Sequence, residues 1–132
     1  GLEEKMKKLG RNVALQGEII GPKINGNRHR TSGTNEYYVF NVYDVDAGHY
    51  LDWDEVKTLA AELGLKVVTC IYQGIIKPEW LNSDMLLRYA EEQTYEGGAM
   101  AEGIVLKSDS KFYPFRFSCK AISNRYLIKY NL

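Results

Sequence analysis

The chain has 132 residues, of which 45% are hydrophobic and 26% are charged, and its 17 basic and 17 acidic residues give a formal net charge of zero. This length is enough to bury a hydrophobic core, and we expect one domain over residues 1–132. The composition excludes a low-complexity chain, and no run approaches the roughly 18 apolar residues of a membrane span, so we expect no membrane partner.

The charge is distributed unevenly along the chain. Residues 1–30 carry seven basic residues against three acidic ones, residues 31–106 carry four against thirteen, and residues 107–132 carry six against one. The local net charges are therefore +4, −9 and +5. A basic C-terminal segment suits contact with a polyanion, although basic segments that simply face solvent explain the pattern equally well.

Cysteine and histidine give no metal-binding or catalytic pattern. Cys70 and Cys119 lie far apart and match no C-x-x-C spacing. We expect two buried thiols in a reducing cytoplasm, with a disulfide as the alternative. His29 and His49 offer no zinc-ligand spacing. A histidine-based or thiol–histidine catalytic site therefore has no support.

The first half of the chain predicts strands separated by a long loop, followed by a helix. Residues 12–20 alternate, and residues 36–46 are rich in aromatic and β-branched side chains, which favours strands. Residues 21–35 between them are rich in Gly, Asn, Thr, Ser and Arg, which is typical of a functional or mobile loop. A D-x-x-E box at Asp52 and an apolar stripe predict a helix that ends at Gly64. The other elements expected here are a basic helix over 2–9 and a short strand over 49–51.

The second half predicts further strands and two helices. A buried strand is expected over 66–71, a charged-ended strand over 102–107, and a strand over 112–122 that Pro114 interrupts. Helices are expected after Asn82 or Ser83, with Met85, Leu86, Tyr89 and Ala90 inward, and over 125–130, capped by Ser123 and Asn124. The fold class is therefore α+β, a mostly antiparallel sheet with flanking helices.

Four residues on the expected strands have chemical potential, namely Glu18, Phe40, Glu102 and Lys120, and Lys107 closes the run that Glu102 opens. Each has an ordinary alternative, because the charged residues can face solvent or protect a sheet edge, and Phe40 can belong to the core. Lys120 is harder to explain in this way, since strand alternation places it opposite its apolar neighbours.

Together these residues resemble the covalent nucleotidyltransferase superfamily, and within it the ATP-dependent RNA ligases of the second phage type and their bacterial relatives. Four segments match in the family's order. Residues 15–27 (LQGEIIGPKINGN) resemble GE[LI]xGPxIQxN, residues 37–43 (YYVFNVY) resemble the third motif, residues 102–107 (EGIVLK) resemble the fourth motif EGxVxK, and residues 117–120 (FSCK) followed by 121–124 (AISN) resemble the fifth. The third motif usually reads FD, where this chain has Phe40-Asn41.

The resemblance implies a role for each of the five residues. Glu18 would accept hydrogen bonds from the ribose hydroxyls. Phe40 would stack on adenine, a contact of about 1–3 kcal/mol. Glu102 would bind a divalent cation through its carboxylate. Lys120 would neutralise the α-phosphate, with Lys107 as a second cation. Positioning and electrostatics would supply most of the catalysis.

Two positions depart from the family pattern. The family's nucleophile is the lysine of a KxxG motif upstream of the GE segment. Lys7 and Gly10 match this motif literally, but Lys7 lies on an expected helix only eleven residues before Glu18, so we interpret the match as coincidental. Ser118 stands where related enzymes often carry the first lysine of K-x-K, and Arg116, on the same face by alternation, is a candidate to compensate.

The resemblance implies that the chain is the central-to-C-terminal portion of an RNA ligase adenylylation domain, without the nucleophile segment. The parent enzyme would use ATP and Mg²⁺ (or Mn²⁺) to form a lysyl-AMP, transfer AMP to an RNA 5′-phosphate and seal it to a 3′-hydroxyl. Nicked duplexes or broken RNA ends are the expected substrates, in cytoplasmic RNA repair. We expect residues 1–132 alone to be inactive in self-adenylylation, and we predict no particular oligomeric state.

Two alternatives remain open at this point. A DNA ligase or a capping-type nucleotidyltransferase would share the fold, although the GPxIxxN loop and the Ser-Asn continuation after Lys120 argue for RNA by resemblance. A non-catalytic nucleic-acid-binding module is the second alternative. It is supported by the basic segment 107–132 and by ten tyrosines, most of which we assign to the core.

Overall fold

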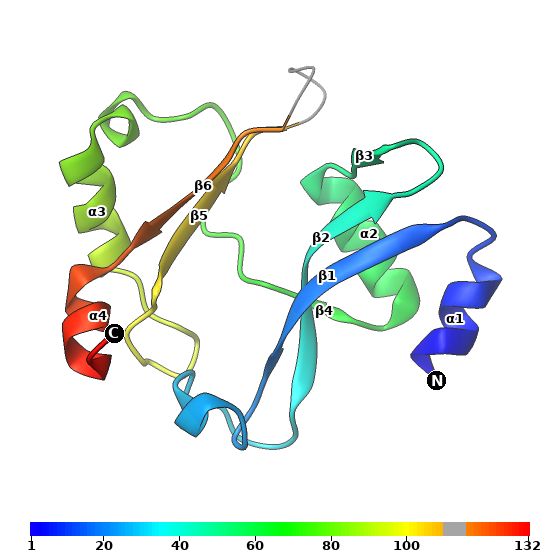
Figure 1. Ribbon diagram of the computed structural model, residues 1–132, viewed down its shortest axis with the longest axis horizontal. Helices are drawn as coiled ribbons and strands as arrows, with labels where there is room; N and C mark the ends of the chain where they lie inside the picture. The colour runs from blue at the N-terminus through cyan, green and yellow to red at the C-terminus, as the bar shows by residue number, and fades with distance from the viewer. Residues whose placement is uncertain (110–115) are drawn as a thin grey trace. The chain divides into compact units, whose positions relative to one another are not determined.

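The computed structural model describes residues 1–109 and 116–132, and these residues form two compact units (Figure 1). Each unit is built from segments that are distant in the sequence. Unit 1 contains residues 1–20 and 35–69, together with Asp109 and Arg116. Unit 2 contains residues 21–34, 70–108 and 117–132.

Unit 1 is a small sheet covered by a helix. Strands β1, β2 and β3 are antiparallel neighbours in that order, and β4 pairs with β2 in parallel. Helix α2 packs against β2, and the buried core lies between them (Figure 1). The elements are α1 (Leu2–Lys8), β1 (Val13–Ile20), β2 (Glu36–Asp44), β3 (His49–Tyr50), α2 (Trp53–Leu63) and β4 (Lys66–Val67). The core consists of Val39, Val42, Leu51, Val56, Leu59, Ala60 and Leu63.

The ends of α2 are determined by local sequence. The Asp52 side chain accepts from the backbone of the third helical residue, and the Glu55 side chain accepts from the Asp52 backbone N–H at 3.0 Å, which completes the expected capping box. Gly64 ends the helix in the left-handed region with φ 71°, a conformation that glycine adopts at no steric cost. The predicted helix and both of its limits are confirmed.

Unit 2 combines a two-stranded sheet with two helices. Strands β5 and β6 are antiparallel, and α3 packs against both of them and against α4. The elements are η1 (Asn25–Asn27), η2 (Pro78–Leu81), α3 (Ser83–Glu91), β5 (Gly103–Lys107), β6 (Ser118–Ile122) and α4 (Asn124–Tyr130). Its buried residues include Ala90, Ala99, Ala101, Ala121, Ser123 and Tyr126. Asn82 and Ser123 cap α3 and α4 as the sequence predicts.

The loop over 21–34 belongs to unit 2, where it is closed by its own hydrogen bonds and packs against Tyr95 and Gly97. The Asn27 side chain makes hydrogen bonds of 2.9–3.1 Å with the backbone and hydroxyl of Thr31, which close the loop on itself. The His29 ring stacks on Tyr95 with centroids 3.7 Å apart. A Cβ at Gly97 would lie 2.3 Å from the His29 carbonyl oxygen, so this approach requires glycine.

The α+β fold with mostly antiparallel strands is confirmed, but several details of the prediction are wrong. The strand expected over 66–71 is limited to Lys66–Val67, because the same edge of β2 is occupied further along, where Leu51 donates its N–H to the Val42 carbonyl. Met85 is not inward, since 48% of its surface is exposed. The strand expected over 66–71 is not buried either, since Lys66, Cys70 and Ile71 are exposed. Of the strand expected over 112–122, residues 112–115 lie outside the described residues, and β6 begins only at Ser118, so Arg116 and Phe117 precede it.

Within the described part of the chain, every helix is too short or too polar to cross a bilayer.

Candidate functional site

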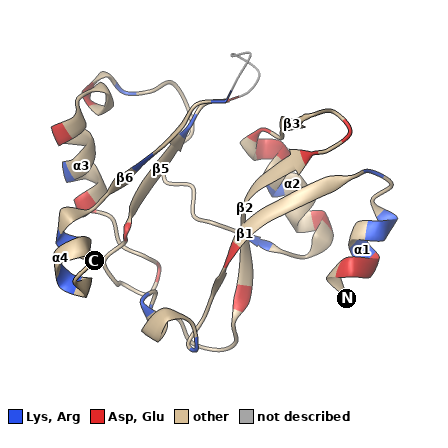
Figure 2. Cartoon of the chain, in the orientation of Figure 1, with Lys and Arg blue, Asp and Glu red and all other residues tan. Residues whose placement is uncertain are grey.

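The five residues predicted from sequence divide between the two units. Glu18 and Phe40 lie in unit 1, on β1 and β2. Glu102, Lys107 and Lys120 lie in unit 2, on or beside the β5–β6 pair, whose strands carry basic residues (Figure 2).

A β-bulge determines how Phe40 is presented. The register of the β1–β2 ladder shifts between Gln16, which pairs with Asn41, and Gly17, which pairs with Val39. Phe40 is therefore the additional residue on β2, and such bulges re-aim side chains and are frequent beside active sites. Strict alternation would place Val39 and Val42 on opposite faces, yet both are fully buried.

The bulge brings Phe40 and Glu18 to the same side of unit 1. Because Val39 faces the core, its neighbour Phe40 lies on the opposite face, where it is half-buried. Glu18 is exposed, and it alternates with Gly17, which is paired with Val39 on the core side. Both predicted residues of unit 1 therefore lie on the face turned away from the core.

Gly17 leaves no room for a side chain beside this bulge. A Cβ at position 17 would lie 2.4 Å from the Tyr38 carbonyl oxygen and 2.6 Å from the Tyr37 ring. The Tyr37 hydroxyl donates to the Leu15 carbonyl at 3.3 Å, which holds the ring across β1, and its burial raises the pKa of Tyr37. The glycine of the GE segment therefore has a steric function that the sequence pattern did not identify.

Arg116 lies elsewhere than the sequence predicted. Alternation placed it within the last strand, on the face of Ser118, but β6 begins at Ser118 and Arg116 precedes it. Its Nη2 donates to the Asn41 Oδ1 at 2.6 Å, and its Cζ lies 4.3 Å from the centroid of the Tyr50 ring, both in unit 1. Burial lowers the pKa of Arg116 from its ordinary value, but an arginine remains protonated in proteins.

Lys107 and Lys120 share one face of the β5–β6 pair. Lys107 is opposite Ser118, and Lys120 is opposite Val105, and all four residues are exposed. The intervening pairs, such as Ile104 with the buried Ala121, form the other face, and α3 packs against this sheet. The prediction that Lys120 lies opposite the apolar side of its strand is confirmed for Cys119, whereas Phe117 precedes β6 and is 56% exposed.

Glu102 and Lys120 form an ion pair in unit 2. Their side chains are 38% and 45% exposed, so solvent screens the pair strongly. The Glu102 backbone is fixed on both sides, because its N–H donates to the Tyr95 hydroxyl at 3.1 Å and its carbonyl accepts from the Ser123 N–H at 2.8 Å. A Cβ at the adjacent Gly103 would lie 2.1 Å from the Ala121 carbonyl oxygen.

The donor set does not form a metal cage by itself. Among residues 1–109 and 116–132, no three or more His, Cys, Asp or Glu residues are grouped so that they could hold an ion. Glu102 supplies one carboxylate, which suits a hard cation such as Mg²⁺ that retains several waters and takes its other ligands from a phosphate. The residues thus fit a cation that arrives with a phosphate ligand.

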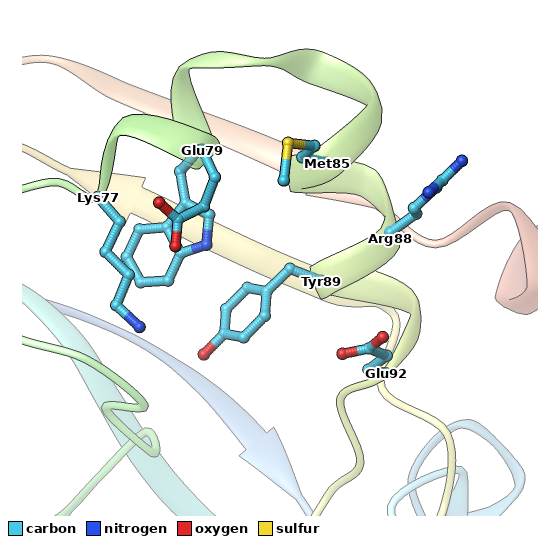
Figure 3. Close-up of a pocket in the computed structure, with 7 residues that line it drawn as sticks. Lys77, Glu79, Met85, Arg88, Tyr89 and Glu92 are labelled. Atoms are coloured by element: carbon cyan, nitrogen blue, oxygen red, sulfur yellow. The ribbon is translucent and has the colours of Figure 1, made fainter.

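Two other features do not belong to this group of residues. Lys7 lies exposed on α1 and pairs with Glu3 at 2.7 Å, one helical turn away. A cavity of about 300 Å³ opens between η2 and α3 in unit 2, where Figure 3 shows acidic, basic and aromatic side chains around it. Its lining residues are Lys77, Glu79, Trp80, Met85, Arg88, Tyr89 and Glu92. Their two basic and two acidic charges balance, and none of the five predicted residues lines it.

Comparison with known proteins identifies the family. A family model described as RNA ligase matches residues 1–130. The chain belongs to the RNA ligase family. Naegleria gruberi RNA ligase with PPi is 32% identical, with a TM-score of 0.82 over 98% of this chain and 38% of that one. Variants of that ligase with ATP and Mn, and with AMP and Mn, are each 34% identical, with TM-scores of 0.81 and 0.80. They are matched over 98% and 97% of this chain and 38% and 37% of theirs. No curated protein sequence matches the chain.

Membership of the RNA ligase family confirms the resemblance that the motifs indicated, and it favours RNA ligases over DNA ligases and capping enzymes. The match extends over nearly the whole chain, whereas the chain spans less than two fifths of the length of these ligases. Of these three ligase structures, one contains PPi, one contains ATP and Mn, and one contains AMP and Mn.

Proposed function

We propose that the protein is an ATP-dependent RNA ligase and that residues 1–132 act as one part of its adenylylation domain. The observation that carries this proposal is the RNA ligase family match over residues 1–130, which includes all four motif segments. In the proposed reaction a lysine amine attacks the α-phosphate of ATP and releases pyrophosphate. AMP then passes to an RNA 5′-phosphate, and a 3′-hydroxyl attacks that phosphate, forming the phosphodiester and releasing AMP.

Unit 1 would contact the nucleoside part of ATP. Phe40 stacks on adenine, and Glu18 accepts hydrogen bonds from the ribose hydroxyls. The common face of Phe40 and Glu18, turned away from the core, supports these roles, because neither residue is needed to fill the core. The bulge beside Gly17 supports them as well, since it determines the direction of the Phe40 side chain.

Unit 2 would contact the phosphates. Lys120 and Lys107 neutralise the phosphate charge that grows during displacement, and their common exposed face supports this. Glu102 would hold Mg²⁺ or Mn²⁺, and the ion when bound would neutralise phosphate oxygens. The carboxylate that would hold the cation is thus positioned by the backbone contacts of Glu102.

The ion pair between Glu102 and Lys120 suggests how both residues change partners when a nucleotide binds. Exposed ion pairs contribute only about 0–1 kcal/mol, so a phosphate can replace the carboxylate at the Lys120 ammonium at little cost. Glu102 is then available for the cation. We therefore expect the metal to bind Glu102 much more tightly with a nucleotide than without one.

The substrate and the setting are the remaining parts of the proposal. The family match supports RNA as the substrate, presented as nicked duplexes or broken ends during RNA repair. We propose that the protein acts in the reducing cytoplasm, and the free thiols of Cys70 and Cys119 suit that setting. Their expected burial is wrong, because Cys70 is exposed and Cys119 is only half-buried.

The proposal is tested by sealing of a labelled nicked RNA duplex by the complete protein, with ATP and Mg²⁺. Lys120→Ala and Glu102→Gln should each reduce sealing by at least about tenfold, since each removes a charge-assisted contact worth about 1.5–3 kcal/mol. Lys7→Ala is the matched control, an exposed lysine on α1 that should seal at the wild-type rate.

Three results would count against the proposal in different ways. Sealing that survives both Lys120→Ala and Glu102→Gln would contradict their roles. Loss of ATP-dependent labelling in Lys7→Ala would make Lys7 the nucleophile, against our interpretation. RNA binding without any ATP-dependent sealing by the complete protein would favour the non-catalytic nucleic-acid-binding module.

A further inference from the structure

A polar cluster on unit 1 is not explained by the roles above. It consists of Gln16 on β1, Asn41 on β2, Tyr50 on β3, and Arg116, which lies two residues before the start of β6. The Asn41 amide is its centre, because its Oδ1 accepts from Arg116 at 2.6 Å and its Nδ2 donates to the Gln16 Oε1 at 2.9 Å. Gln16 in turn donates to the Tyr50 hydroxyl at 3.5 Å.

This polar cluster lies on the same face of the sheet as Glu18 and Phe40. Gln16 precedes Glu18 by two residues on β1, so strand alternation places both side chains on one side. Asn41 is paired with Gln16 and follows Phe40 directly. A ligand that covers Glu18 and Phe40 would therefore also meet the residues that surround Arg116.

Among the residues that the structure describes, no carboxylate forms an ion pair with Arg116. Its side chain is half-buried, and its contacts in the described part of the chain are the Asn41 amide and the Tyr50 ring, at 4.3 Å. Arg11, in the same unit, differs in this respect because it forms an ion pair with Asp44. A guanidinium has five N–H donors, so the bond to Asn41 leaves donors for a further acceptor.

These contacts orient the Arg116 side chain before any ligand binds, as expected for an arginine that binds an oxyanion. The guanidinium carbon of Arg116 lies over the Tyr50 ring, and the Asn41 oxygen accepts from one of its nitrogens, so these two contacts reduce the entropy lost on binding. A planar guanidinium with remaining donors matches a phosphate group in a bidentate manner. An aspartate at position 41 would neutralise the charge of Arg116, whereas the uncharged amide of Asn41 does not.

We propose that Arg116 is a phosphate-binding residue of unit 1, oriented by Asn41 and Tyr50. The phosphate belongs either to the polyphosphate of ATP or to the RNA strand. The proposal rests on the proposed function for these two sources, but the chemistry of the site requires only a phosphate group.

The test is a titration of the complete protein with four ligands: ATP, inorganic pyrophosphate, and one oligoribonucleotide with either a 5′-phosphate or a 5′-hydroxyl. Arg116→Gln should weaken binding of at least one phosphate ligand by about tenfold or more, as expected for a lost charge-assisted hydrogen bond. Asn41→Asp keeps Arg116 but places a carboxylate beside it. This variant should weaken binding of the same ligand, because the carboxylate competes with the phosphate for the guanidinium. Lys57→Gln, on the exposed side of α2, is the matched control and should bind as the wild type does.

The pattern of loss identifies the source of the phosphate. If only ATP binding is weakened, Arg116 contacts the polyphosphate. If only the 5′-phosphorylated RNA binds more weakly, Arg116 contacts the 5′-phosphate. If both RNAs bind more weakly to the same extent, Arg116 contacts the phosphate backbone. Wild-type affinity of Arg116→Gln for all four ligands, with an unchanged circular dichroism spectrum, would overturn the inference and leave the proposed function intact. Binding of pyrophosphate that depends on Arg116, without binding of ATP or RNA, would support the inference and contradict the proposed function.

Discussion

Replacing Gly17 with alanine tests whether the bulge at Phe40 is a built feature of unit 1. The new Cβ would lie 2.4 Å from the Tyr38 carbonyl oxygen and 2.6 Å from the Tyr37 ring. The Tyr38 oxygen is backbone on the neighbouring strand, so relief requires β1 and β2 to separate or the bulge to move. Overpacking of this kind typically costs about 1–3 kcal/mol.

Two terms determine the expected size of the effect. Alanine restricts the unfolded chain and returns about 0.4–1 kcal/mol, so Gly17→Ala should lose on the order of 1–2 kcal/mol of unfolding free energy. At a urea dependence of about 1–3 kcal/mol per molar, the unfolding midpoint should fall by roughly 0.3–2 M at unchanged slope. Because Phe40 is the bulged residue, ATP binding should weaken as well.

Gly48→Ala separates lost stability from a displaced Phe40. A Cβ at Gly48 meets nothing within 4 Å, but its φ of +74° makes alanine strained there by about 1–2 kcal/mol. This variant should be destabilised to a similar extent and should bind ATP like the wild type. If Gly17→Ala keeps both the wild-type midpoint and the wild-type affinity, the strands accommodate the side chain and our account of the bulge is refuted.

Two further predictions concern stability. Hydrogen bonds from the Ala47 N–H and from Arg11 hold the pKa of Asp44 below its ordinary value, so their stabilisation is complete above about pH 4, the unfolded value, and is lost as the pH falls through the folded pKa. Urea midpoints measured from pH 6 to pH 2 should therefore fall more steeply in the wild type than in Asp44→Asn, and parallel curves would contradict this. Ser123→Ala removes the buried hydroxyl that accepts from the Tyr126 N–H at 3.1 Å, and calorimetry should detect a loss of about 0.5–2 kcal/mol. An unchanged melting temperature would show that this cap contributes nothing.

The elements that the sequence predicted well are those with a local physical cause. Helix α2 has its capping residue, its apolar stripe and its terminal glycine within one stretch of the chain, so each signal could be recognised without knowledge of the fold. The same holds for α4, where Ser123 caps the helix as expected. The candidate residues were recognised because four short segments of the chain resemble motifs of the RNA ligase family and follow one another in the family's order.

The features that were missed depend on pairing between distant segments. A bulge at Phe40 cannot be read from Val39 to Val42, because all four residues fit a strand and only the register with β1 identifies the extra one. The length of β4 depends on the pairing of Leu51, whose N–H donates to the Val42 carbonyl on the same edge of β2. Arg116 was misplaced because alternation was extended past the first residue of β6, whose position the pairing with β5 determines.

The binding of ATP to single variants tests the central claim, that both units contribute to nucleotide binding. Titration calorimetry with Mg²⁺ would compare Phe40→Ala from unit 1 and Lys120→Ala from unit 2 with the wild type. Loss of the stacking ring is expected to weaken ATP binding by about 1–3 kcal/mol, and loss of the ammonium by about 1.5–3 kcal/mol, which corresponds to roughly fivefold to 150-fold. The account predicts a loss of this size in each variant. An unchanged affinity in either one would contradict it.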